Sequence, residues 1–338
     1  FDLSPHRAVF RKASAESLPT QRARLAERLA RADRRRSTRK RDRPHPDLAH
    51  VYRIRIPRGK SLEDAKAALE ADPHVEYAQA DHVITLDQAE TPFTDPFLSS
   101  SGSWGQPYGD LWGLEQIDAP RVWSSTQGDG VVVAVVDTGL DRFHPDIADN
   151  VWVNPGEDMN GDGRATPEDA NGIVDDGNGF IDDITGFNFV DSIDVDEDGF
   201  YDGPDDVSNP DPFDTVGHGT HVSGTIAAVA GNGIGIAGVA PRARIMALRG
   251  FPTTGPAADS DLWRAVLYAA ENGAHVVNNS WSCREACPEN PLAEDVLALV
   301  DALDTVVVTS AGNASQDVLF RSPENGSRVL TVGAVGFD

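Results

Sequence analysis

The sequence has only two cysteines, Cys283 and Cys287, among its 338 residues. It therefore cannot be a small scaffold held together by many disulfides. Long hydrophobic runs are also missing, since the longest strongly apolar stretch is VVVAVV at 131–136. A membrane-spanning helix needs about 20 apolar residues, so we predict no membrane segment in this stretch. Because it begins at Phe1 without a charged and then apolar leader, we expect that the natural N-terminus and any signal peptide lie outside it.

Basic residues become scarce after residue 60. Residues 1–60 hold 18 Lys and Arg against 6 Asp and Glu, the remainder holds 11 against 48, and the net charge is −25. The acidic part would repel phosphates, which argues against nucleic acid as a partner. It suits either cation binding or a salty, extracellular setting. The basic run at 31–43 is interpreted as a solvated helix end and loop, with a nucleic-acid arm as the alternative.

Composition divides the chain into three predicted segments. Residues 1–88 are predicted to form a small α+β domain, a compact ferredoxin-like sheet with two helices on one face. Residues 89–110 are rich in Pro, Gly, Ser and Thr, which is typical of a linker open to proteolytic cleavage. The first segment's predicted elements are strands near 8–11, 51–56 and 75–86 and helices over 17–34 and 62–71, the second helix capped by Ser61.

From residue 111 the pattern predicts an α/β domain with an open, mainly parallel sheet and helices on both faces. The continuous apolar run at 131–137 is typical of a parallel strand that is covered on both faces. Further strands are predicted at 244–249, 274–279, 305–310 and 328–333, and helices over about 218–230, 260–272 and from Pro291 to about Leu303. The 260–272 helix is expected to have Asp259 or Ser260 as its N-cap and Gly273 as its C-cap.

Three polar residues follow or begin these buried elements. Asp137 ends the first buried strand, His218 begins a predicted helix among glycines, and Asn313 lies just beyond another strand. Each residue alone is typical of a turn or a structural contact. Together they lie at the ends of different elements of one sheet, which is how catalytic groups are commonly assembled.

The motifs around these residues resemble those of the subtilisin-like serine proteases, or subtilases. The resemblance covers about 111–338 and rests on VAVVDTGLDRFHPDI, GHGTHVSGTIAA, IAGVAPRARIMALR, VVNNSWS and TSAGN, which occur in the family's order. It implies that Asp137 orients His218, that His218 is the general base and then general acid, and that Asn313 donates to the oxyanion. The related serine-carboxyl peptidases fit less well, because they have a glutamate where this chain has His218.

The nucleophile that the resemblance implies is missing from this sequence. No segment like the family's GTSMA occurs before Asp338, so we expect that the chain stops short of the catalytic serine. The fragment itself should then hydrolyse no peptide bonds. The alternative is a non-catalytic calcium-binding or adhesion protein built on an inactive subtilase fold, and a GTSMA-like segment downstream would exclude it.

The resemblance extends to the N-terminal segment and to maturation. Residues 1–88 resemble the family's inhibitory propeptide, especially at ADPHVEYAQADHVITL. The implied partners are polypeptide substrates and the protein's own propeptide in cis, whose basic charge complements the acidic domain. Cleavage within about 87–103 would release a secreted enzyme.

Substrate binding in the family adds the peptide as a strand between two segments. The matching positions are Gly250 and Phe251 on one side and Ser280, Trp281 and Ser282 on the other, with Arg321 at the base of the primary specificity pocket. Trp281 would line an apolar subsite or simply pack. A buried Arg321 would favour an acidic residue before the scissile bond. In an exported enzyme Cys283 and Cys287 would form a disulfide, with a free pair as the alternative.

The acidic excess is concentrated at 156–214, which hold 19 Asp and Glu and one basic residue, Arg164. Alternating carboxylates and amides are typical of structural Ca²⁺ loops, with a solvated acidic insertion as the alternative. The predicted ligands are Asp158, Asn160, Asp162 and Asp169 in one loop, Asp194, Asp196, Asp198 and Asp205 in another, and Asp176, Asn178 and Asp182 between them. The resemblance adds Asp146 and Asn232, which match the family's strong calcium site. No cofactor is expected for catalysis.

Overall fold

The computed structural model describes residues 61–73, 75, 78, 93–190, 208–283, 287, 290–313, 315 and 317–337. The chain divides into one unit formed by 36–88 and another formed by 1–35 with 89–338. The elements predicted before residue 61, and almost all of the strand region at 75–86, lie outside the described residues. The division into segments 1–88, 89–110 and 111–338 therefore stays a prediction.

The smaller unit contains the helix α2, Leu62–Glu70. The Ser61 hydroxyl accepts a hydrogen bond from the Asp64 N–H at 3.0 Å, as expected for an N-cap. Lys66 and Glu70 form an exposed ion pair one turn apart. The helix ends one residue earlier than predicted.

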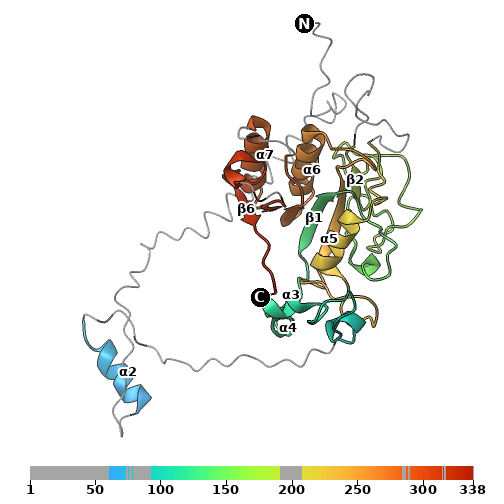
Figure 1. Ribbon diagram of the computed structural model, residues 1–338. Helices are drawn as coiled ribbons and strands as arrows, with labels where there is room; N and C mark the ends of the chain where they lie inside the picture. Colours follow the sequence, from blue (N-terminus) through green and yellow to red (C-terminus); the bar gives the residue numbers. More distant parts are fainter. Residues whose placement is uncertain are drawn as a thin grey trace. The chain divides into compact units, whose positions relative to one another are not determined.

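The larger unit is built on a parallel sheet of six strands in the order β2-β3-β1-β4-β5-β6. Figure 1 labels β1, β2 and β6 of this sheet. The predicted strands are β1 (Val132–Asp137), β3 (Arg244–Arg249), β4 (Val276–Asn279), β5 (Val306–Ser310) and β6 (Val329–Val332), and the structure adds β2 (Gly186–Asn188). Asp137 pairs with Arg249 in β3, and Asn279 at the end of β4 pairs with Thr309. The carboxyl ends of the strands thus meet at one edge, where the loops of an α/β sheet form sites.

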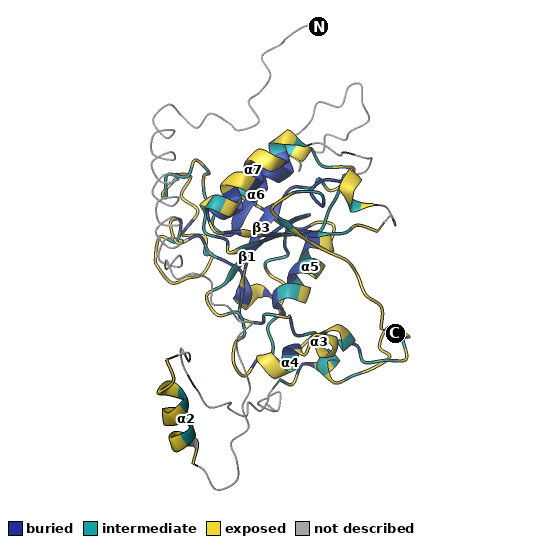
Figure 2. Cartoon of the chain, turned by 90° about the vertical axis from the view of Figure 1, so that its left-hand side faces the viewer, coloured by how far each residue is buried: buried dark blue, intermediate teal, exposed yellow. Residues whose placement is uncertain are grey.

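Helices cover both faces of the sheet, as the apolar strands predict. Ala134 and Val136 of β1 face the cluster that contains α6 (Asp259–Glu271) and α7 (Pro291–Ala302). Val133 and Val135 point the other way, toward α5 (His218–Ala227). Figure 2 shows α7 dark blue toward the sheet and yellow on its outer side, whereas α6 is buried along most of its length. The alternation explains why these strands are apolar at every position.

The short helices lie before the sheet and in the connections between its strands. They are η2 (Pro96–Leu98), α3 (Trp112–Gln116), α4 (Ala119–Val122), η3 (Ala148–Asn150) and, near β6, η4 (Val318–Phe320). Residues 93–110 fall within the predicted linker at 89–110, but they are packed into the larger unit. Phe93, for example, contacts Trp123 edge to face at 5.1 Å. None of the helices in the described residues has the length and apolar character needed to cross a membrane.

The helix ends differ slightly from the sequence prediction. The N-cap of α6 is Ala258, and Asp259 instead accepts a hydrogen bond from the Trp263 indole at 2.8 Å. The prediction of Asp259 or Ser260 as N-cap was therefore wrong by at least one residue. Gly273 directly follows the C-cap residue Asn272 with φ +91°, in the left-handed conformation that glycine adopts most easily. α5 ends at Ala227, before the predicted residue 230.

Candidate active site

A carboxylate and an imidazole meet where β1 ends and α5 begins. The Oδ1 atom of Asp137 lies 2.7 Å from Nδ1 of His218. Asp137 is only 2% exposed, whereas the His218 side chain is 55% exposed. The buried acid therefore holds one ring nitrogen, and the rest of the ring reaches the surface.

Backbone groups fix the position of Asp137. The Thr138 N–H donates to its Oδ1 at 2.7 Å, and the Gly250 N–H donates to its carbonyl at 2.8 Å. Its other carboxylate oxygen, Oδ2, is buried without a hydrogen-bond partner in the described part of the chain. The side chain is therefore held by one oxygen, the same oxygen that faces the imidazole.

Two glycines allow the helix to approach the strand this closely. A Cβ atom at Gly219 would lie 2.2 Å from the Gly139 carbonyl oxygen and 3.1 Å from Cβ of Asp137. Gly139 itself has φ +111°, and a Cβ there would lie 2.4 Å from the Pro212 carbonyl oxygen. The glycines of GHGTH and DTG are thus required by the contact that brings the acid to the histidine.

Asp214 organises the start of α5, and the sequence analysis missed it. Its Oδ1 accepts hydrogen bonds from the N–H groups of Val216 and Gly217 and from the Thr138 hydroxyl. Its Oδ2 accepts from the N–H and hydroxyl of Thr220. Burial alone would raise the pKa of Asp214, but these hydrogen bonds outweigh it and hold the pKa below the ordinary value of 3.8. An aspartate just before a helix start is a recognisable capping signal.

Asn313 lies beyond the end of β5, at the same edge of the sheet as Asp137. Its side chain is exposed. Since β4 lies between β1 and β5, the predicted oxyanion donor is two strands away from the acid and histidine. The structure thus brings Asp137 and His218 into contact and leaves Asn313 on the same edge.

The predicted substrate-binding residues follow the ends of β3 and β4. Gly250 is required by packing, because a Cβ there would lie 2.6 Å from a Leu262 methyl group, and Phe251 packs against the core. Trp281 lies edge to face with Trp263 at 5.7 Å, as expected for a packing role. In the described part of the chain, the hydroxyl groups of Ser280 and Ser282 take part in local hydrogen bonds, to Asn278 and to the Cys283 carbonyl.

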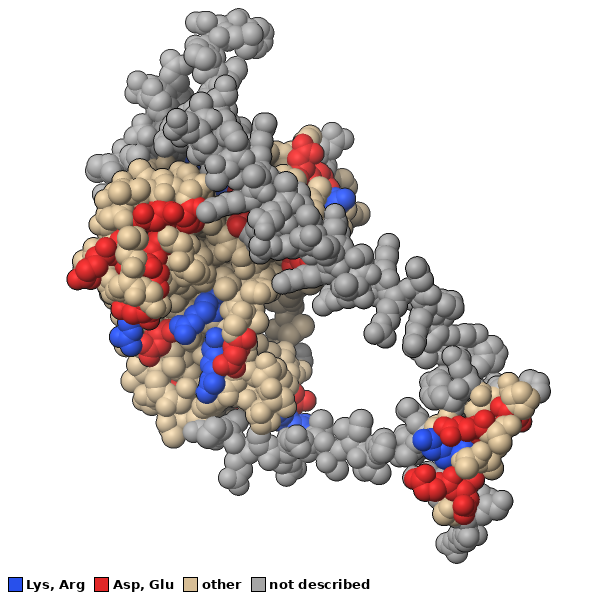
Figure 3. Space-filling view, turned by 180° about the vertical axis from the view of Figure 1, so that it is seen from behind, with Lys and Arg blue, Asp and Glu red and all other residues tan. Residues whose placement is uncertain are grey.

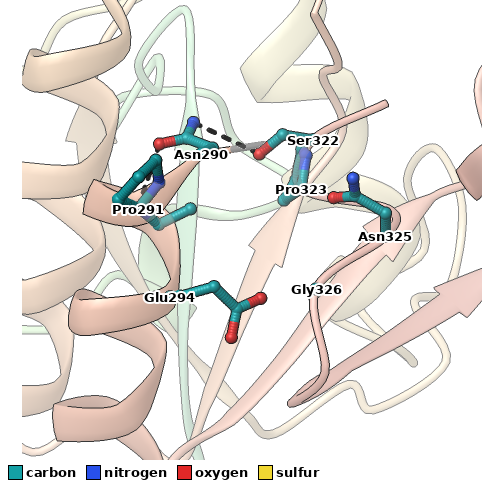
Figure 4. Close-up of a pocket in the computed structure, with 8 residues that line it drawn as sticks. Asn290, Pro291, Glu294, Ser322, Pro323, Asn325 and Gly326 are labelled. Carbon is teal, nitrogen blue, oxygen red and sulfur yellow. Dashed lines mark hydrogen bonds between the residues drawn. The ribbon is translucent and has the colours of Figure 1, made fainter. Parts of the chain in front are cut away.

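Cys283 and Cys287 form a disulfide, as predicted for an exported enzyme. Arg321 is buried, and its Nη2 donates to the Cys283 carbonyl. Behind this loop a cavity of about 340 Å³ lies between the start of α7 and residues 322–326. Figure 4 shows Asn290 and Ser322 joined across it by a hydrogen bond of 3.3 Å. None of the residues that line this cavity is a predicted catalytic residue.

The predicted calcium ligands Asp146 and Asn232 lie together. Asn232 donates to Asp146 Oδ1 at 2.8 Å, and the Ile236 N–H donates to Oδ2 at 2.8 Å. A Cβ at Gly235 would lie 2.1 Å from Asp146 Oδ2, so the backbone forms a close cradle around this buried carboxylate. Asp95, which the sequence analysis missed, accepts the Gly231 N–H beside them.

The loop at 158–169 has the turns of a calcium loop without a gathered set of carboxylates. Asp158 accepts hydrogen bonds from the N–H groups of Gly161 and Gly163. Asn160 accepts one from the N–H of Asp162, and Asp162 accepts one from the N–H of Arg164. Asp169 is fully buried, and hydrogen bonds from Thr166 and Met159 outweigh that burial and lower its pKa. These carboxylates form no group of three with ligand atoms within 4.8 Å among the residues described. Asp194, Asp196, Asp198 and Asp205 lie outside the described residues.

A different group of carboxylates does gather. Glu157, Asp176 and Asp183 each offer a ligand atom, and these atoms lie within 4.8 Å of one another. Burial and the neighbouring carboxylates raise the pKa of Glu157 to about 7, and burial raises that of Asp183 to about 6. Burial and the charge of Asp183 raise the pKa of Tyr268 well above its ordinary value.

The other two residues predicted in this segment have different contacts. Asp182 accepts the N–H groups of Asn171 and Gly172. Asn178 donates to Asp183 and accepts from the Phe180 N–H, so it lies beside the group as a donor. Only Asp176 of the three predicted residues belongs to the gathered group.

The surface of the described residues carries acid and base unevenly. Figure 3 shows acidic side chains in several separate places and the fewer basic side chains close to acidic ones. Ion pairs of this kind join Arg242 to Asp129 at 3.3 Å and Arg142 to Asp211 at 2.5 Å. Exposed pairs contribute little to stability, so the buried carboxylates are the more informative ones.

Comparison with known proteins decides the family. The sequence profile of the subtilase family matches residues 128–336, which include Asp137, His218 and Asn313. The chain belongs to the subtilase family. This subtilase is 31% identical over 276 residues to the thermophilic serine proteinase of Bacillus sp. (strain AK1), covering 81% of this chain and 53% of that protein. It is 33% identical over 232 residues to the intracellular serine protease of Paenibacillus polymyxa, covering 67% and 56%.

Two further similarities concern an extracellular relative and a solved structure. The extracellular basic protease of Dichelobacter nodosus is 30% identical over 298 residues, covering 82% of this chain and 44% of that protein. A solved protease from Pseudoalteromonas arctica PAMC 21717 matches with a TM-score of 0.51 and 24% identity, covering 72% of this subtilase and 66% of that chain. The second similarity shows the fold alone. The chain spans about half the length of the curated relatives it matches.

Gly219→Ala should destabilise the chain by about 1–3 kcal/mol, because the added Cβ overlaps the Gly139 carbonyl and forces α5 away from β1. The hydrogen-bonded Nδ1 proton signal of His218 should weaken or disappear in NMR spectra. Gly224→Ala in the same helix is the matched control, since its Cβ would meet only Ile236 at 3.8 Å. That change should be neutral or stabilise by up to about 1 kcal/mol. Equal urea midpoints for the two variants would contradict this account.

Asp214→Asn should lower the free energy of unfolding by about 1–2 kcal/mol near pH 6, because the amide group presents N–H atoms to N–H donors. The pKa of Asp214 is depressed in the folded state, so its contribution is present above the unfolded pKa and is lost as pH falls below it. The difference between wild type and variant should therefore shrink below about pH 4. Urea unfolding at pH 6 and pH 3.5 measures it, and an unchanged difference would rule out this role.

Proposed function

We propose that this protein is a secreted serine endopeptidase that hydrolyses polypeptides through an Asp–His–Ser triad. The observation that carries the proposal is the hydrogen bond between buried Asp137 and exposed His218 at the carboxyl edge of a subtilase sheet. A binding protein has no need to bury a carboxylate against a surface imidazole. Relatives named as serine proteases support the same activity.

The two residues have distinct roles in this proposal. Asp137 accepts the Nδ1–H of His218, which leaves Nε2 as the unprotonated, surface-directed base. His218 takes the proton of the serine hydroxyl as that oxygen attacks the peptide carbonyl, and Asp137 stabilises the resulting imidazolium. His218 then gives the proton to the leaving amine, and the acyl group is released by the reverse sequence with water. Asn313 is proposed to donate to the oxyanion, an interaction worth about 2.7–4 kcal/mol in related chemistry.

The nucleophile is proposed to come from polypeptide beyond the residues printed here. No serine hydroxyl donates to His218 within the described part of the chain, where the imidazole has Asp137 as its partner. The protein's curated relatives are about twice as long as the matched region, which leaves room for that serine. The 338 residues would then supply the acid, the base and part of the substrate cleft.

The substrate is proposed to bind as an extended strand between 250–251 and 280–282. Both segments directly follow strands at the carboxyl edge, on either side of β1. The basic N-terminal segment is proposed to act as an inhibitory propeptide in cis. Secretion is supported by the disulfide and by relatives named as extracellular proteases.

Calcium is proposed to stabilise the folded domain and to take no part in the chemistry. The close cradle around Asp146, with Asn232 and Asp95 beside it, fits a hard cation that prefers oxygen ligands. The loop at 158–169 has suitable residue types, and its side-chain oxygens would have to turn inward to share an ion.

Arg321 is proposed to favour substrates with an acidic residue before the scissile bond. A buried guanidinium pairs best with a carboxylate, and Nη2 donates to the Cys283 carbonyl, which fixes the guanidinium beside this loop. The full-length enzyme should have a higher kcat/KM for cleavage after Glu than after Phe. Arg321→Gln should reduce that preference, and equal cleavage after the two residues by the wild type would contradict it.

The central test uses the complete reading frame, purified after maturation and treated with a fluorophosphonate probe. We expect labelling of a serine that lies beyond Asp338, and a fall of about 10⁴-fold in kcat for Asp137→Asn with the fold intact. Asp129→Asn, at an exposed ion pair with Arg242, is the matched control and should keep full activity. A folded, propeptide-free protein without labelling would favour the non-catalytic calcium-binding alternative. Labelling that is insensitive to a calcium chelator would keep the peptidase and remove the calcium proposal.

A further inference from the structure

We infer that Glu157, Asp176 and Asp183 form a buried Ca²⁺ site that ties the acidic insertion to helix α6. Their ligand atoms lie within 4.8 Å of one another. Two Ca–O bonds of about 2.3–2.6 Å span at most about 5 Å, so one ion can contact all three. Neither Glu157 nor Asp183 belongs to the sites proposed above, and the inference does not rest on peptidase activity.

An unpartnered oxygen in this group points to a ligand. Glu157 has no solvent exposure, and its Oε1 accepts the N–H groups of Asp175 at 3.0 Å and Asp176 at 3.3 Å. Its Oε2 is buried and has no hydrogen-bond partner among the residues that the structure describes. A buried carboxylate oxygen without a partner is costly, so it requires either a proton or a cation.

The surrounding side chains orient the carboxylates without neutralising them. The Asn154 side-chain amide donates to both Asp176 and Asp183 at 3.2 Å. Its side-chain oxygen Oδ1 accepts the Gly156 N–H, which fixes the direction of the amide group. Asn178 and the Tyr268 hydroxyl also donate to Asp183. In the described residues no Lys or Arg forms an ion pair with the three carboxylates. Neutral donors around acidic ligands are the usual outer layer of a metal site.

The backbone is shaped to bring the ligands together. A Cβ at Gly156 would lie 2.2 Å from Cβ of Asp176, so only glycine allows the Glu157 segment to approach this closely. Tyr268 is fully enclosed in the middle of α6, and Asn272 of the same helix contacts Asn178 at 3.3 Å. An ion at this point would link residues 154–183, edge strand β2 and α6.

The test counts calcium bound to the 338-residue chain after EGTA treatment and titration with CaCl₂, by native mass spectrometry and calorimetry. Glu157→Gln should bind one ion fewer per chain than wild type, and its thermal midpoint should rise less with calcium. Asp129→Asn removes an exposed carboxylate that pairs with Arg242, away from every calcium loop proposed above, and is the matched control, so it should retain this ion. If Glu157→Gln fails to fold, half-buried Asp176→Asn replaces it.

Two outcomes would overturn the inference. Wild type and Glu157→Gln could bind the same number of calcium ions, or the wild-type chain could bind none at millimolar CaCl₂. In either case the three carboxylates would share protons instead of an ion. The readout is the number of bound calcium ions and not hydrolysis. An inactive full-length protein would therefore not contradict the calcium-site inference, and an active one would not support it.

Discussion

The arrangement of this subtilase depends on the close contact between the end of β1 and the start of α5. That contact places a buried carboxylate against an exposed imidazole, and it exists only because Gly139 and Gly219 leave no side chain between strand and helix. The chain runs from β1 to the edge strand β2 and then through α5, which packs on one face of the sheet, to β3, the neighbour of β1. The same geometry orients the loops that follow β3, β4 and β5 toward one edge. The catalytic proposal, the substrate segments and the oxyanion position all follow from it.

Buried carboxylates form the second theme of the molecule. Asp137, Asp146, Asp169 and Asp214 are all buried, and each is held chiefly by backbone N–H or side-chain hydroxyl and amide groups. Hydrogen bonds to a carboxylate stabilise its charged form even without a basic partner. Where such donors are too few, as at Glu157, the pKa rises instead. The acidic composition is therefore not only a solvated surface, because part of it organises loops around the sheet.

Local sequence patterns predicted most of the sheet and the two contacting site residues. The apolar runs at β1 and β3 are unambiguous because both faces of these strands are covered, and the glycine-rich motifs mark where strand and helix must meet. The sequence did not predict β2, because a strand of three residues is too short to show a periodic pattern. Gly186 belongs to the strand because its backbone pairs with Ala247 of β3, which is distant in the sequence. Asp214 had a local signal as a helix cap, whereas Asp95 had none. Asp95 accepts a hydrogen bond from the N–H of Gly231, which lies 136 residues further along the chain.

The sequence by itself determined which residues are available for the chemistry: an aspartate after a buried strand, a histidine at a helix start and an acidic insertion with one basic residue. Spacing along the chain could not determine which carboxylates share one site. It favoured Asp176 with Asn178 and Asp182, whereas the folded chain gathers Asp176 with Glu157 and Asp183. The physical reason is that a buried group is defined by segments that meet only when β2 and α6 close over the insertion. Desolvation and the direction of each donor are properties of that closed arrangement and not of the local chain.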